Sequence, residues 1–258
     1  MDRLENLKNI IMYLMADEHV SHQIPSSLEE RQRMMRALMN VWEPRPISED
    51  FLKMQDAELQ MQCEDKGVVE ISDITPQTSD ILLWQGDITR LKLDVIVNAA
   101  NAQVLGCWAP LHNCIDNCIH SAAGIQLRKE CADKMQGRLL ATGDAFITQG
   151  YNLPARHVIH TVGPIIPDGI STKEKEEQLA QCYHSCLDLA EQNGLESIAF
   201  CCISTGVFMF PNQRAAEIAV DTVRKYYQET GSQIRTIFNV YKDLDWEIYD
   251  RLLNHQSL

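Results

Sequence analysis

Cys107, His112 and Cys114 place two thiols and an imidazole within eight residues, in the pattern C-x4-H-x-C. Thiolate sulfur and imidazole nitrogen together suit Zn²⁺, and chance rarely produces such a density of these ligands. Three protein ligands leave a fourth coordination position open, which is typical of catalytic zinc sites. We therefore predict one zinc ion that either polarises a substrate oxygen or lowers the pKa of a water.

The sequence also allows two alternatives to an open zinc site, a closed site with a fourth protein ligand and no metal site at all. Cys118 or His120 could supply a fourth ligand and close the site, because Cys118 lies four residues after Cys114 on a predicted helix. The three side chains could also be unrelated buried groups, although their spacing argues against this; we favour the open site. Asp116 could act as a base or orient a water, or could stabilise the start of that helix.

Other candidate ligand groups follow predicted strands. A β-branched apolar run predicts a strand buried on both faces, and the run ends at Asn98 and Asn101. Open α/β sheets bind ligands at the carboxyl ends of such strands. The loops at residues 86–89 and 204–208 also follow predicted strands. Glycine in the second loop would let backbone N–H groups cradle phosphate, although such loops are often plain turns and Asp87 could equally cap the next element.

The first 70 residues are predicted to form an all-helical extension. Apolar residues recur at helical spacing over residues 4–14. Ser27 and Glu30 form a capping box for a second helix, and Ser48 opens a third that stops near Gly67. The methionines of these helices favour core filling over a groove for promiscuous partners.

From Val68 onward, strand and helix patterns alternate, which is typical of a mostly parallel sheet covered by helices. Strands are predicted at residues 81–84, 95–99, 145–148, 157–161, 197–203 and 236–240. Helices are predicted at residues 115–135, from a cap at Ser171 to Asn193, at residues 212–230, and through Trp246 to Leu253. The sequence thus predicts two parts, the helical extension over residues 1–70 and an α/β domain over residues 71–258.

Composition narrows the classes of function. The chain of 258 residues has a formal net charge of −13 and a pI near 5.0, which argues against neutralising nucleic-acid phosphates with a basic face. Nine cysteines at irregular spacing do not suggest a disulfide scaffold, so we predict that the protein is located in a reducing cytoplasm. The N-terminus has neither a basic leader nor a cleavage site, and its apolar run is too short to span a membrane.

Six segments together resemble, in order, the macrodomain family in its MacroD-type branch. They are Gly86-Asp-Ile-Thr89, Asn98-Ala-Ala-Asn101, Ala141-Thr-Gly-Asp-Ala-Phe146, Gly150-Tyr-Asn-Leu-Pro154, Val158-Ile-His-Thr-Val-Gly-Pro164 and Ser204-Thr-Gly-Val-Phe208. The resemblance covers roughly residues 70–256. It implies a three-layer α/β/α sandwich with a mixed, mostly parallel central sheet. Macrodomains bind ADP-ribose, and MacroD-type members hydrolyse the ester that joins it to acidic side chains.

The resemblance also implies roles for residues of this chain. Asp87 would accept a hydrogen bond from the adenine amino group, and Ile88 would contact the same end of the ligand. The loop that contains Ser204 and Thr205 would bind the diphosphate through the N–H groups of Gly206 and Val207. Phe208 would pack on the distal ribose, and Asn101 would orient that ribose. The expected ligand-binding residues are therefore Asp87, Ile88, Asn101, Ser204, Thr205, Gly206, Val207 and Phe208.

The chain departs from the MacroD-type pattern in two places. MacroD-type proteins usually have a glycine run before a catalytic aspartate, whereas this chain has the metal-ligand cluster before Asp116. In this respect it resembles the zinc-containing microbial subgroup, whose members combine the fold with an N-terminal helical extension. Met209 stands where the common loop pattern has glycine.

We therefore predict a cytoplasmic, zinc-dependent hydrolase that removes mono-ADP-ribose from acidic side chains of proteins. Its catalytic residues would be Asn101 and Asp116, and its partners ADP-ribose and mono-ADP-ribosylated proteins. Two other functions fit the same pocket, a non-catalytic ADP-ribose-binding module with structural zinc and an O-acetyl-ADP-ribose deacetylase. No nucleic-acid or membrane partner is expected.

Overall fold

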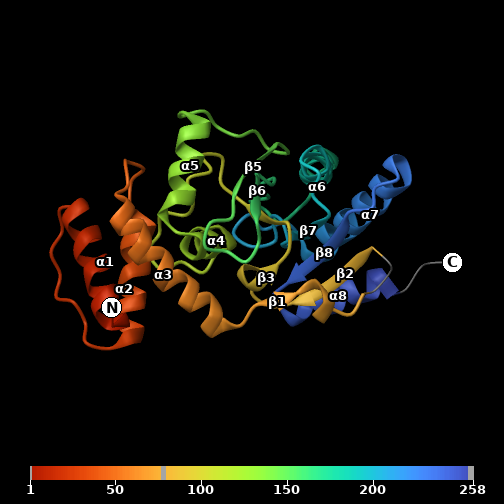
Figure 1. The fold of residues 1–258 in the computed structure, drawn as a ribbon. Coiled ribbons are helices and arrows are strands. Elements are labelled where there is room, and N and C mark those ends of the chain that lie inside the picture. The colour runs from red at the N-terminus through yellow and green to blue at the C-terminus, as the bar shows by residue number, and fades with distance from the viewer. Residues whose placement is uncertain (1, 77–79, 255–258) are drawn as a thin grey trace.

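The computed structural model describes residues 2–76 and 80–254 (Figure 1). The helices are α1 (Arg3–Asp17), α2 (Leu28–Val41), α3 (Glu49–Lys66), α4 (Ile115–Ala123), α5 (Ile125–Met135), α6 (Lys173–Gln192), α7 (Asn212–Thr230) and α8 (Asp243–Asn254). The strands are β1 (Val69–Glu70), β2 (Ile81–Gln85), β3 (Leu91–Lys92), β4 (Val95–Ala99), β5 (Ala145–Gln149), β6 (His157–Thr161), β7 (Ser197–Phe200) and β8 (Arg235–Val240).

Helices α1, α2 and α3 form the predicted extension and have a small core of their own. Ser27 and Ser48 cap α2 and α3 by accepting hydrogen bonds from backbone N–H groups three residues later. Apolar side chains from all three helices form one buried cluster, in which Met35 and Met39 fill space as predicted. Ile125 of α5 joins this cluster, so the extension packs against the rest of the molecule through apolar contact as well as polar groups.

The central sheet has six strands in the order β2-β8-β7-β4-β6-β5. All neighbouring strands are parallel except β5 and β6, which confirms a mixed, mostly parallel sheet. After β4 the chain adds strands on one side, and from β7 it adds them on the other. The order of strands therefore reverses beside β4, and at such a point the carboxyl ends of strands form a ligand crevice.

Helices flank both faces of this sheet in the predicted three layers (Figure 1). Helices α6, α7 and α8 pack side by side as one layer, and α4 and α5 form the other, next to α2 and α3. The main core lies between these layers and the sheet.

Three sequence-based boundaries are wrong. The single helix predicted at residues 115–135 is two helices, because Gly124 has a φ of +102° that a continuing helix does not allow. Helix α6 is capped by Thr172 rather than Ser171, whose hydroxyl instead bonds Glu176. Strand β7 ends at Phe200, three residues before the predicted end, because the chain there turns into the following loop. The short strands β1 and β3 were not predicted.

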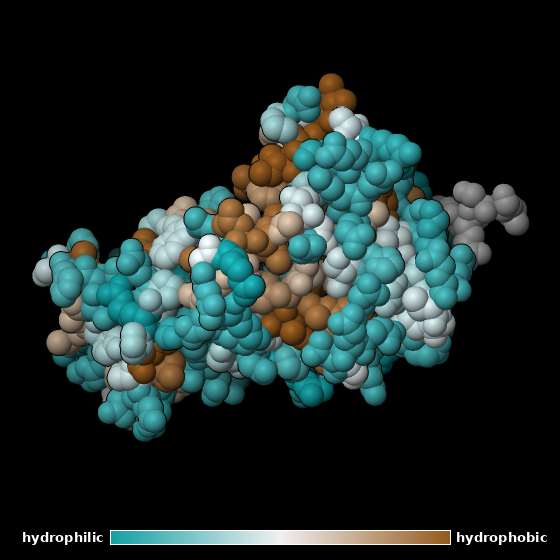
Figure 2. Space-filling model, turned by 90° about the horizontal axis from the view of Figure 1, so that it is seen from above, coloured by the Kyte–Doolittle hydropathy of each residue, from teal (hydrophilic) through white to brown (hydrophobic). Residues whose placement is uncertain are grey.

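One face of the molecule is mainly polar. Hydrophilic residues cover most of the face seen in Figure 2, and hydrophobic residues gather near its middle. Within residues 2–76 and 80–254, no helix has both the length and the apolar character required to cross a bilayer.

Candidate active site

The loop before α4 brings the predicted metal ligands together. The ligand atoms of Cys107, His112 and Cys114 all lie within 4.8 Å of one another, and Cys107 Sγ is 3.5 Å from His112 Nδ1. His112 is exposed and both cysteines are half-buried, so the group is open to solvent. Burial and the neighbouring Cys107 thiol raise the pKa of Cys114 to about 12. A divalent cation bound between Cys107 and Cys114 would stabilise both side chains as thiolates. The donor set therefore fits Zn²⁺.

Neither predicted alternative fourth ligand belongs to this group within the described chain. Cys118 Sγ lies 3.8 Å from the guanidinium of Arg36. His120 is buried, with its Nε2 3.6 Å from Asp116 Oδ1. A second cluster, His120, Cys131 and His160, also has closely spaced ligand atoms but is fully buried. Both ring nitrogens of His160 already lie at hydrogen-bond distance from side chains, so we assign this cluster a structural role.

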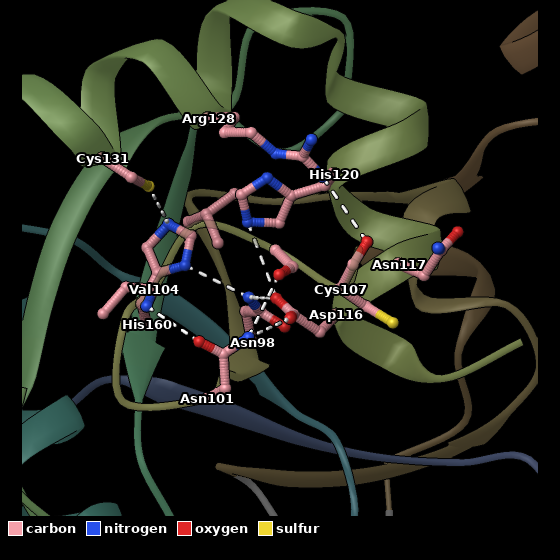
Figure 3. A network of polar contacts seen from close by, with 12 residues as sticks. Asn98, Asn101, Val104, Cys107, Asp116, Asn117, His120, Arg128, Cys131 and His160 are labelled. Carbon is pink, nitrogen blue, oxygen red and sulfur yellow. Dashed lines mark hydrogen bonds and ion pairs between the residues drawn. The ribbon is translucent and has the colours of Figure 1, made fainter. Parts of the chain in front are cut away.

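Asp116 is the polar centre of the site. Its Oδ1 accepts a hydrogen bond from Asn98 Nδ2 at 2.8 Å, and its Oδ2 accepts one from Asn101 Nδ2 at 3.3 Å (Figure 3). Burial raises the pKa of Asp116 to about 6, although the Asn98 hydrogen bond and the charge of Arg128 oppose this shift. Because each carboxylate oxygen accepts a hydrogen bond from an amide, Asp116 is held with both oxygens as acceptors, as a general base requires.

A buried chain of hydrogen bonds fixes the orientation of Asn98. Asn98 and His160 are paired neighbours on β4 and β6, and Asn98 Nδ2 lies 3.1 Å from His160 Nδ1 (Figure 3). Thr148 Oγ1 donates to the carbonyl of Val158, so it can accept from His160 Nε2 at 3.0 Å. His160 is then neutral with its proton on Nε2, and burial lowers its pKa to about 3. Both amide protons of Asn98 are thereby used, one on His160 and one on Asp116.

Asn101 connects the metal loop to Asp116. Its Nδ2 donates to the carbonyl of Gly106 at 3.1 Å as well as to Asp116, and its Oδ1 accepts from the N–H groups of Gln103 and Val104. A Cβ on Gly106 would come within 2.8 Å of the His120 ring, so only glycine fits there. Asn101 thus links the residue before Cys107 to the predicted base.

The predicted adenine-binding residues lie at the carboxyl end of β2. Asp87 Oδ1 accepts from the backbone and hydroxyl of Thr89, and Oδ2 lies 3.1 Å from Lys66 Nζ of α3. Burial acts to raise the pKa of Asp87, but Thr89 and Lys66 outweigh it and lower the pKa. Ile88 is buried. Asp87 and Thr89 also line a cavity of about 180 Å³ between the extension and α4.

The predicted phosphate loop follows β7 in a strained conformation. Ser204 and Met209 have φ values of +66° and +56°, in the left-handed region that favours glycine. The positive φ of Met209 explains why the family pattern has glycine at this position. Gly206 and Val207 are exposed, and a Cβ on Gly206 would meet no atom within 4 Å. The backbone at Gly206 is therefore free for close approach by a ligand.

Sequence reasoning missed the residues that support the site from a distance. Thr148 orients His160, Lys66 pairs with Asp87, and Arg36 and Asn40 contact the metal loop. Arg128 is 3% exposed, donates to three carbonyls at the end of α2, and lies with its Cζ 4.1 Å over the Trp108 ring. No local pattern identifies these residues. Their roles depend on contacts between segments that are distant in sequence.

Comparison with known proteins decides the family. The Macro domain model matches residues 97–219. Over 266 aligned residues the chain is 46% identical to a protein-ADP-ribose hydrolase of Staphylococcus aureus (strain MSSA476), and the alignment covers 100% of both. The chain belongs to the macrodomain family. A protein-ADP-ribose hydrolase of Treponema medium is 47% identical to this macrodomain protein, with 95% of this chain and 97% of the relative covered.

Solved macrodomain structures share the fold. The Trypanosoma brucei macrodomain in complex with ADP-ribose is 30% identical, with a TM-score of 0.66 over 89% of this chain and 97% of that one. The Oceanobacillus iheyensis macrodomain with ADP is 36% identical, with a TM-score of 0.62 over 70% of this chain and 93% of that one. This macrodomain therefore has the predicted sandwich, preceded by helices α1–α3. The boundary at residue 70 stays a prediction.

Proposed function

We propose that this macrodomain protein is a zinc-dependent hydrolase that removes mono-ADP-ribose from acidic side chains of proteins. The observation that carries the proposal is the amide of Asn101, which bonds both Asp116 and the carbonyl that precedes Cys107. Asn101 thereby connects the loop of Cys107, His112 and Cys114 to the buried carboxylate of Asp116. The relatives that match over nearly their whole length are named protein-ADP-ribose hydrolases, which supports the removal of ADP-ribose from proteins. A cytoplasmic location stays a prediction.

Different residues have different roles in the hydrolysis. The reaction consumes one water, breaks the C–O ester bond and yields free ADP-ribose and a side-chain carboxylate. Asn101 orients the distal ribose, and Asp116 orients the water and accepts its proton. Cys107, His112 and Cys114 would hold the Zn²⁺. When bound, the ion supplies Lewis-acid polarisation of a substrate oxygen.

The remaining predicted residues bind ADP-ribose without acting on the scissile bond. Asp87 accepts from the adenine amino group and Ile88 contacts the same end. The backbone N–H groups of Gly206 and Val207, in the loop with Ser204 and Thr205, bind the diphosphate. Phe208 packs on the distal ribose. An acidic protein suits this mode of binding, because backbone dipoles rather than lysines neutralise the phosphates.

The decisive experiment measures release of ADP-ribose from a protein modified on Asp or Glu, before and after zinc chelation. ADP-ribose binding is followed on the same samples. We expect turnover to disappear with zinc while binding and fold persist. Binding without turnover in either state would contradict the proposal and indicate a binding module. Faster turnover of O-acetyl-ADP-ribose than of modified protein would indicate the deacetylase.

Substitution of Gly206 by valine tests the phosphate loop. Because a Cβ at Gly206 meets no protein atom within 4 Å, the free energy of unfolding should stay within about 0.5 kcal/mol. The branched side chain would occupy the space that the diphosphate needs, so ADP-ribose affinity should fall roughly tenfold, or about 1.4 kcal/mol. Calorimetric titration measures the affinity, and Gly206→Ala should show a smaller loss. Unchanged affinity in Gly206→Val would remove this loop from the site.

A further inference from the structure

Two side chains of the helical extension hold the part of the metal loop that carries His112. Asn40 Oδ1 accepts a hydrogen bond from the backbone N–H of Leu111 at 2.9 Å. The Arg36 guanidinium donates to the carbonyl of His112 at 2.8 Å. Arg36 and Asn40 are four residues apart on α2, so they lie on the same face of the helix. The dipeptide Leu111–His112 is therefore held at both ends by one helix turn.

The conformation held in this way is one that the loop would not favour alone. Leu111 has a φ of +60°, in the left-handed region that side chains other than glycine rarely adopt. Such a residue persists where surrounding contacts fix it. Here the contact is the buried amide of Asn40, which also donates to Ser121 of α4 at 3.0 Å. The direction of the His112 side chain follows from this backbone.

Further bonds fix α2 relative to the loop and to α4. Arg36 also donates to Asn117 Oδ1 at 2.9 Å, and Asn117 Nδ2 donates to the carbonyl of Ala109 in the loop at 3.0 Å. Arg128 donates to the carbonyls of Met39, Asn40 and Trp42 at the end of α2. The extension, the loop and α4 thus form one bonded unit around the three ligands.

We infer that Arg36 and Asn40 are positioning residues for the metal, and that the helical extension serves to preorganise His112 as a zinc ligand. The inference rests on the proposed zinc site. Side chains that orient metal ligands through hydrogen bonds commonly change metal affinity roughly tenfold to a hundredfold when they are removed. The extension then contributes to the site without contacting the ion.

The test is the affinity for Zn²⁺ alone, measured on metal-free full-length protein by competition with a chromophoric chelator. We expect Arg36→Met and Asn40→Ala to bind Zn²⁺ roughly tenfold to a hundredfold more weakly. Arg36→Lys, which keeps a cationic donor, should recover part of the loss. ADP-ribose affinity of zinc-free Asn40→Ala should not change, because Asn40 lies outside both the predicted ligand set and the cavity that Asp87 lines.

Matched controls come from contacts inside the extension. Arg3 pairs with Glu58 and Asp65, and the buried amide of Asn6 donates to the carbonyl of Met54. Arg3→Met and Asn6→Ala remove similar groups from the extension but touch no part of the metal loop. They should lower the stability of the zinc-free protein and leave its zinc affinity unchanged.

The outcomes separate this inference from the proposed function. Equal zinc affinity in Arg36→Met, Asn40→Ala and the two controls would overturn the inference, even if the unchanged protein is an active hydrolase. Zinc binding that is weakened as expected, in a protein that releases no ADP-ribose, would support the inference and contradict the proposed function. An unchanged protein that does not bind Zn²⁺ would overturn both.

Discussion

Replacement of Cys107 by alanine will reduce ADP-ribose release by on the order of 10³-fold, while ADP-ribose still binds. The substitution removes one of the three predicted zinc ligands, and Lewis-acid stabilisation by a metal is worth several kcal/mol, at about 1.4 kcal/mol for each factor of ten. Binding should persist because, apart from Asn101, the predicted ligand contacts come from other loops, at residues 87–88 and 204–208. Single-turnover rates and titration of ADP-ribose measure the two effects separately.

Cys118→Ala is the matched control for Cys107→Ala. Cys118 lies near the ligand group in sequence, but its sulfur is directed to Arg36 and it does not belong to the group of three. Its removal should leave one Zn²⁺ bound and turnover nearly unchanged. Loss of zinc in Cys118→Ala would mean that the site is closed by a fourth protein ligand. Turnover that survives in Cys107→Ala would show that the ion is not part of the reaction.

The local features of the fold and site were predictable from sequence. Helical spacing and capping residues predicted α1, α2 and α3, because these signals lie within one or two turns of chain. The apolar run of β4 predicted a buried strand, and the side chains of Val95, Ile96 and Val97 are fully buried. The C-x4-H-x-C spacing predicted a ligand group, and a short loop does bring these residues together.

What the sequence could not predict depends on distant contacts or on backbone conformation. Asn98 and His160 are 62 residues apart and meet only because β4 and β6 are paired in a particular register. Asn40 and Leu111 are 71 residues apart and have no common pattern. The left-handed conformations of Leu111, Ser204 and Met209 also leave no trace in residue type, since glycine is the usual indicator and is absent at all three.

Asp116→Asn will lower kcat by roughly 10²- to 10⁴-fold, the usual contribution of a general base, and will change KM less. The amide has nearly the shape of the carboxylate but only one acceptor oxygen. Asn98 and Asn101 each donate to a different oxygen of Asp116, so one of these donors would face an NH₂ group in the variant. The variant thus loses the proton acceptor and also disturbs the hydrogen bond from Asn98 or from Asn101.

Asp94→Asn is the control for Asp116→Asn, because Asp94 is also a carboxylate held by several donors. Its oxygens accept from the N–H of Glu196, the hydroxyl of Ser197 and the guanidinium of Arg156, but it lies at the amino end of β4, away from the site. Its substitution should lower stability without lowering kcat. If Asp116→Asn loses no more kcat than Asp94→Asn, then Asp116 only stabilises the first turn of α4, and the proton must be accepted by another group.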